Sequence, residues 1–119
     1  MILKPQFVIL AATIFGDRVY PAGDAQPGTT AYCTYSAISE VEESDLDANG
    51  GADNLCNTRL QIDVWAERYS EAQTKAKDLR DALKLWNVVN VFQSAEDMYE
   101  TETKLHRVML DISFWHSYN

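Results

Sequence analysis

The chain has 119 residues, a hydrophobic fraction of 46% and a net charge of −8. This length predicts a single domain spanning residues 1–119, because so short a chain can bury one core but not two. No apolar run reaches the ~18–20 residues that a membrane-spanning helix requires, which argues against that class of protein and against a membrane partner. An acidic chain is also poorly suited to gripping DNA phosphates, which requires a basic face.

The negative charge is concentrated in one part of the chain. Between Arg18 and Arg59 there is no lysine or arginine, and the same stretch holds seven acids: Asp24, Glu40, Glu42, Glu43, Asp45, Asp47 and Asp53. Such a run can simply keep an exposed loop solvated, which the charge alone favours. It can also line a path along which DNA slides, because like charges keep DNA from sticking.

The first segment, residues 5–15, is almost continuously apolar. Its apolar side chains recur at helical spacing, and Gly16 provides a stop after it. We expect a helix covered on most sides, partly by a neighbouring subunit, since a small domain cannot easily enclose a whole helix. A signal peptide is the weaker alternative, because Asp17 and Arg18 interrupt the run before any cleavage site.

A hairpin is predicted next. Residues 18–21 are a short extended piece, and residues 31–39 alternate as a strand after a Gly/Pro loop. Residues 57–67 alternate clearly, and residues 40–55 form a long acidic loop at the hairpin tip. A loop of that length is usually functional or disordered. On the second strand the expected core side is Leu60, Ile62, Val64 and Ala66, and the outward side is Arg59, Gln61, Asp63 and Trp65.

Residues 69–85 predict a second helix. Ser70 and Gln73 match a capping box, in which each side chain satisfies the other residue's free amide. Glu71 and Lys75 form a correctly oriented i,i+4 pair. The apolar stripe that would pack on the sheet consists of Ala72, Ala76, Leu79 and Leu83.

Three further strands are expected, at residues 88–92, 94–102 and 105–116. On the last of them, alternate side chains from Val108 to Phe114 point to the core. The order of helix, three strands, helix and three strands predicts an α+β fold with a mainly antiparallel sheet and two helices packed on it.

The sequence contains no motif for catalysis or cofactor binding. The five glycines form neither a dinucleotide-binding loop nor a P-loop. His106 and His116 share one predicted strand at a separation of about 33 Å, too far apart to hold one metal. The acids of residues 42–53 fail the calcium-loop pattern, because counted from Glu43 the sixth residue is not glycine and the twelfth, Asn54, is not glutamate. We therefore expect no enzyme, no cofactor and no metal site.

The two cysteines, Cys33 and Cys56, show no CxxC spacing. A secreted disulfide scaffold usually carries more cysteines, so we expect reduced thiols, with Cys33 as a small core residue. A single bridge between them is the weaker alternative.

Two tryptophans, Trp65 and Trp115, are predicted on the outward faces of strands. Strands seldom present tryptophan to bare water. Either these side chains belong to a second small core under a helix, or they form a contact between subunits, where tryptophan is enriched.

Several segments together follow a known pattern. Residues 18–21 read R-V-Y-P, and residues 26–35 continue with a Gly/Pro loop and a tyrosine-rich strand. Residues 59–66 fit R-x-Q-x-D-x-W-A, residues 69–72 a helix opening, and residues 105–116 a closing strand L-x-R-x-x-L-D-x-S-x-W. In this order and spacing they resemble the tail completion, or tail-to-head joining, proteins of long-tailed bacteriophages, which are related in role to tail terminators.

This chain departs from the family pattern in two places. Ala31 stands where the family usually has proline, and the acidic loop 40–55 is longer than typical. The role of that loop is therefore less transferable than that of the sheet.

The resemblance implies a structural virion protein with no catalytic residues. Its subunits would form a ring, a hexamer, at the head-proximal end of the tail, with a tail tube protein and a head–neck connector as partners. DNA would pass through the ring without specific binding. Such a protein is found in the virion tail or neck, and in the host cytoplasm during assembly. The candidate interface or lumen residues are Glu40, Glu42, Glu43, Asp45, Asp47, Asp53, Trp65 and Trp115.

Three questions stay open from the sequence. The acidic hairpin can face the lumen, or dock onto the tube or the neck. The chain can also be a tail tube or neck subunit at another level of the virion, since the same fold serves both. A small α+β enzyme or ligand-binding domain is a third alternative, which requires converging polar groups in a pocket.

Overall fold

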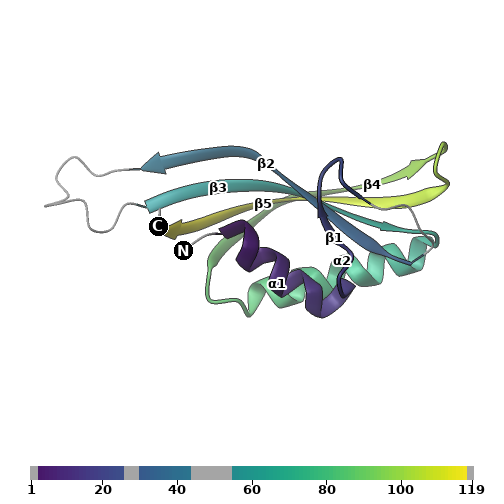
Figure 1. Cartoon of the computed structure of the whole chain (residues 1–119), viewed down its shortest axis with the longest axis horizontal. Helices are drawn as coiled ribbons and strands as arrows, with labels where there is room; N and C mark the ends of the chain where they lie inside the picture. Colours follow the sequence, from purple (N-terminus) through teal and green to yellow (C-terminus); the bar gives the residue numbers. More distant parts are fainter. Residues whose placement is uncertain (1–2, 26–29, 44–54, 118–119) are drawn as a thin grey trace, which may run out of the picture.

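The computed structural model describes residues 3–25, 30–43 and 55–117 and contains one sheet with two helices on the same face (Figure 1). The strands lie in the order β1-β2-β3-β5-β4, and every neighbouring pair is antiparallel except β1 and β2. The α+β architecture predicted from the sequence is therefore confirmed. In chain order the elements are α1 (Leu3–Phe15), β1 (Val19–Pro21), β2 (Tyr32–Glu43), β3 (Leu55–Ala66), α2 (Tyr69–Lys84), β4 (Val89–Glu100) and β5 (Leu105–Ser117).

Two sequence predictions about the strands are wrong in detail. Residues 88–92 and 94–102 are not separate strands, because the chain runs on as β4 through a bulge at Gln93, where the pairing with β5 shifts by one residue. The acidic segment 40–55 is not all loop, since β2 continues to Glu43 and β3 begins at Leu55. A bulge breaks the period-two alternation, which is why one strand is taken for two.

The second helix keeps its predicted face but not its predicted cap. Arg68, with extended backbone, precedes the first helical residue, Tyr69, and makes no side-chain capping bond. The Lys75 ammonium donates to the carbonyl of Ile14 at 3.1 Å, and so satisfies a free carbonyl at the end of α1. As predicted, the buried stripe consists of Ala72, Ala76, Leu79 and Leu83.

The core lies between the helices and one face of the sheet. Phe7 of α1 contacts the rings of Tyr35 and Phe114 edge-on, with centroids 5.8 and 6.4 Å away. Within one subunit only one stripe of α1 is buried, and Ile9 is 64% exposed. The expected cover on most sides is therefore not provided by the subunit itself. The sheet contributes the buried residues Leu60, Ile62, Val64, Ala66, Val108, Leu110, Ile112 and Phe114.

Substituting Leu110 with aspartate should unfold the domain. Leu110 is 1% exposed in the centre of β5, and burying an unpaired carboxylate there costs several kcal/mol, on the order of the whole stability of a small domain. Circular dichroism in a urea titration would measure the loss. Met98→Asp is the matched control, because Met98 is exposed on β4 opposite Arg107. A folded Leu110→Asp variant would contradict the observed strand facing.

Candidate assembly surfaces

The sheet face opposite the helices, called here the outer face, is lined mainly by polar side chains. The registers place Arg59 opposite Asp111, and Trp65 opposite Arg107, on neighbouring strands β3 and β5. Both helices pack on the other face (Figure 1). By alternation from these pairs, the β4 residues on the outer face are Val89, Val91, Ser94, Glu96, Met98 and Glu100.

Two arginines on the outer face are held by carboxylates. Arg59 donates two hydrogen bonds to Asp111, one of them from Nε at 2.8 Å. The hydrogen bond to Asp111 and its negative charge raise the pKa of Arg59. These bonds fix the guanidinium in a bidentate geometry that leaves it less available to other anions.

Arg107 lies at the centre of a second, more buried network. Its Nε donates to Asp63 at 2.9 Å, and its Nη1 donates to Glu100 at 3.1 Å. Burial alone would lower the pKa of Arg107, but the hydrogen bonds and charges of Asp63 and Glu100 raise it above its ordinary value. Asp63 lies on the outward side of β3, as the sequence predicted, but is only 4% exposed. Strand alternation indicates the face of a side chain but not what covers it.

Trp65 is half-buried and has its contacts within its own subunit. Its ring stacks on Tyr32 with centroids 5.9 Å apart, and its Nε1 donates to the Thr34 hydroxyl at 3.1 Å. The Arg107 guanidinium lies 4.9 Å from the indole centroid. Trp65 thus belongs to a small aromatic cluster on the face opposite both helices, so it is not part of a second core under a helix. A contact between subunits stays a prediction.

Trp115 lies on the same face but at the other end of β5, opposite Asn57 on β3 and Val89 on β4. Trp65 is level with Arg107, eight residues before Trp115 on β5, so the two tryptophans are about 27 Å apart along the strand. They share a face, as predicted, but do not form one patch.

The acidic candidates separate into two groups. Glu40 and Glu42 lie on β2, and Glu40 forms an ion pair with Lys4 of α1, with 3.1 Å between the ammonium and the carboxylate oxygen. Glu43 is the last residue of β2. Asp45, Asp47 and Asp53 lie outside the described residues.

Both edges of the sheet are open over long stretches. The three residues of β1 pair only with Cys33, Thr34 and Tyr35. From Ser36 to Glu43, β2 is therefore paired with β3 on one side only, and its outer side has no described partner strand. At the other edge, β4 pairs with β5 on one side only. Its exposed large apolar residues are Val89, Val91, Phe92, Met98 and Tyr99. Unpaired edges of this length are sites for pairing with another chain.

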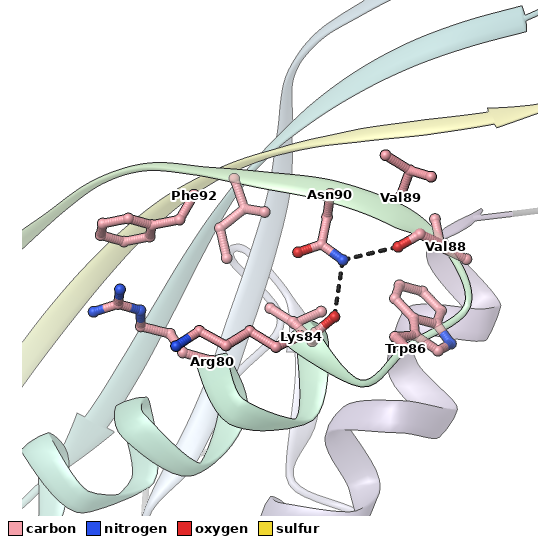
Figure 2. Close-up of a pocket in the computed structure, with 9 residues that line it drawn as sticks. Arg80, Lys84, Trp86, Val88, Val89, Asn90 and Phe92 are labelled. Carbon is pink, nitrogen blue, oxygen red and sulfur yellow. Dashed lines mark hydrogen bonds between the residues drawn. The ribbon is translucent and has the colours of Figure 1, made fainter.

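A groove of 440 Å³ lies between the end of α2 and β4 (Figure 2). Its floor is ordered by Asn90, whose amide donates to the carbonyls of Leu83 and Val88 at 2.9 and 2.8 Å. The Arg80 guanidinium lies over the Phe92 ring, 3.8 Å from its centroid, and Lys84 extends beside it. The groove thus has an apolar floor and a basic rim, which sequence analysis did not identify.

The histidines, cysteines and acids of the described ranges are side chains that could bind a metal ion or act as nucleophiles. In the described ranges, no three histidine, cysteine or acidic side chains are grouped to hold a metal ion. Cys33 and Cys56 are free thiols. Burial, with a smaller contribution from Asp63, raises the pKa of the Cys33 thiol and disfavours the nucleophilic thiolate.

No helix in the described part is long and apolar enough to cross a membrane.

The described part of the subunit thus leaves one sheet face, two sheet edges and a groove with a basic rim uncovered. The chain belongs to the family described as "Tail completion protein gp17", whose model matches residues 9–117. It is thus related to structural proteins of bacteriophage tails, as the sequence motifs indicated. No curated protein matches it.

A solved structure described as "Virion of native gene transfer agent (GTA) particle" contains a chain with a similar fold. The TM-score is 0.66, the sequence identity is 18%, and the match covers 93% of this chain and 89% of that one. A likeness at this identity shows that the two chains share a fold.

Removing the charge of Arg107 should destabilise the protein strongly. In Arg107→Met the buried Asp63 loses its main cationic partner, and an uncompensated buried charge costs about 3 kcal/mol. The measurement is the free energy of unfolding in urea. Arg59→Met is the matched control, because its ion pair is exposed and should contribute far less. Equal losses in the two variants would show that the Asp63 site does not need its cation.

Proposed function

We propose that this chain is the subunit of a ring that ends the tail tube at its head-proximal end and joins it to the neck. The observation that carries the proposal is the match of the tail completion family over residues 9–117. The open sheet edges support it, because a protein that ends a tube must contact both its own copies and the layers above and below.

A ring requires a heterologous contact, in which one surface meets a different surface of the next copy. The chain offers two such surfaces: the open part of β2, and β4 with the groove beside it. The similar chain in the gene transfer agent particle supports a place in a phage-like virion. A ring of six subunits follows from the family resemblance.

The outer face is suited to line the channel through which DNA passes. In the described strands it carries four carboxylates, Asp63, Glu96, Glu100 and Asp111, against two guanidiniums that are both ion-paired. A face with excess negative charge and no free cation would repel phosphates rather than bind them. DNA can then slide past without being held.

Electron microscopy of assembly products tests the proposal. A phage lacking this protein should produce filled heads and separate tails, and purified protein should restore joined particles. Single rings bound at one end of the tail tubes are the expected result. Open-ended polymers of the protein alone would instead favour a tube subunit, and binding only to heads would favour a neck subunit.

Adding positive charge to the outer face should make it bind DNA. The variant Ser94→Lys with Glu96→Lys places two cations on β4 where the face now has a hydroxyl and a carboxylate. Retention of duplex DNA at low salt, measured by gel mobility, should increase, and phage titre should fall although tails look normal.

The matched control is Glu67→Lys with Glu102→Lys, at exposed positions beyond the outer face. It changes the net charge by a similar amount and should leave both readouts unchanged. If the face variant yields normal titre, or if both variants bind DNA equally, the outer face does not line the channel.

A further inference from the structure

We propose that the sheet continues from one copy to the next: the open half of β2, Ser36–Glu43, pairs with β4 of the neighbour, and Glu40 and Glu42 reach its Arg80 and Lys84. This inference rests on the proposed ring and names the surfaces that close it. The occupant of the groove in Figure 2 is thus a second copy of this chain.

The strand directions allow this pairing. β2, β3, β5 and β4 are successively antiparallel, so β2 and β4 run in opposite directions. A neighbour placed beside the sheet with its strands aligned therefore presents β2 antiparallel to β4. Strands in such a pair lie about 4.8 Å apart and share the ladder of hydrogen bonds that both edges now lack.

The open halves also lie at the same height in the sheet. Following the registers across all four strands, Val41 is level with Asn57, Trp115 and Val89. By the same route, Ser36 is level with Ser94. Two copies at equal height would therefore bring the free part of β2 against the first half of β4, which the groove flanks.

The acids and bases then meet on the same face. Glu40 and Glu42 pair with Thr58 and Cys56, whose buried side chains lie on the helix side of the sheet, and Glu40 contacts Lys4 of α1 there. On β4, Asn90 and Phe92 also face the helix side and line the groove. Across the new pair, the carboxylates would lie beside the basic rim.

Glu42, Arg80 and Lys84 are available for this contact, whereas Glu40 is already paired with Lys4 at 3.1 Å. Of the ion pairs in the described part of the chain, none includes Glu42, Arg80 or Lys84. Lys77, by contrast, is paired with Asp81 at 2.7 Å in the same helix. A strongly acidic chain thus keeps two cations, Lys84 and the Arg80 that lies over Phe92, outside the described ion pairs and beside an exposed apolar edge, which fits an acidic strand better than a neutral one.

The other face of the new pair would be apolar. Val41 is 49% exposed, and Val89 and Val91 are 65% and 48% exposed. The registers place all three on the outer face, with Val41 level with Val89. Pairing would cover side chains that the single subunit leaves in water.

Reversing the charge of each surface tests the contact. Glu40→Lys with Glu42→Lys, and separately Arg80→Glu with Lys84→Glu, should each reduce ring formation at least tenfold. Mass photometry with and without purified tail tubes measures the rings, and thermal unfolding by circular dichroism checks that the exposed substitutions leave the fold intact. An equimolar mixture of the two variants should recover rings, because every contact in an alternating ring then joins opposite charges.

The remaining outcomes separate this inference from the proposed function. Glu67→Lys with Glu102→Lys is the matched control and should assemble like the wild type. Reversed variants that form normal rings, or a mixture that fails to recover them, overturn this contact while the ring proposal stands. Reversed variants that form rings but no longer hold tubes would assign the groove to the tube protein instead. A wild-type chain that stays monomeric with tail tubes overturns both proposals.

Discussion

The architecture depends on the burial of one face of a sheet whose other face and outer edges are left uncovered by the described part of the subunit. Both helices lie on that one face, and their apolar stripes meet the alternating core residues of β3 and β5. Because both helices lie on the other face, the outer face has no covering layer in the described part of the subunit. The outer face is therefore polar and held by its own ion pairs, and the edges end in unpaired backbone groups. These are the surfaces through which a small subunit can join a larger assembly.

Local sequence patterns predicted those parts that depend on local periodicity. The alternation in β3 and β5 and the stripe of α2 gave the core correctly, because each follows from the side-chain direction of a regular element. The prediction of two strands in place of β4 was wrong, because the bulge at Gln93 shifts the alternation of side chains by one residue. The prediction of a capping box was wrong, because helix α2 begins at Tyr69, directly after Arg68, without a side-chain cap. Its first turn is fixed by tertiary contacts that a local motif does not include.

The candidate sites were harder to predict, because they depend on which strands are neighbours and at what height. Trp65 and Trp115 share a face, as expected, but the register separates them by eight residues. The burial of Asp63 requires Arg107, which lies 44 residues away in the sequence. The basic groove combines residues of α2 and β4, each of which looks like an ordinary surface position in its own element. None of these relations has a signal in a single window of sequence.

The charge asymmetry of the two edges has a consequence for symmetry. Two copies related by a twofold axis would pair β2 with β2, which brings acids to acids, or β4 with β4, whose own charged side chains, Glu96, Asp97 and Glu100, are also acidic. Like charges at such a contact cost free energy, whereas the head-to-tail arrangement joins Glu42 to Arg80 and Lys84 in every interface. Head-to-tail contacts close into rings when the rotation between copies divides a full turn, and extend without limit when it does not. In the proposed arrangement, the acidic β2 edge and the basic groove beside β4 would therefore disfavour twofold dimers, and the closing angle would be set by the twist of the sheet and by the tube beneath it.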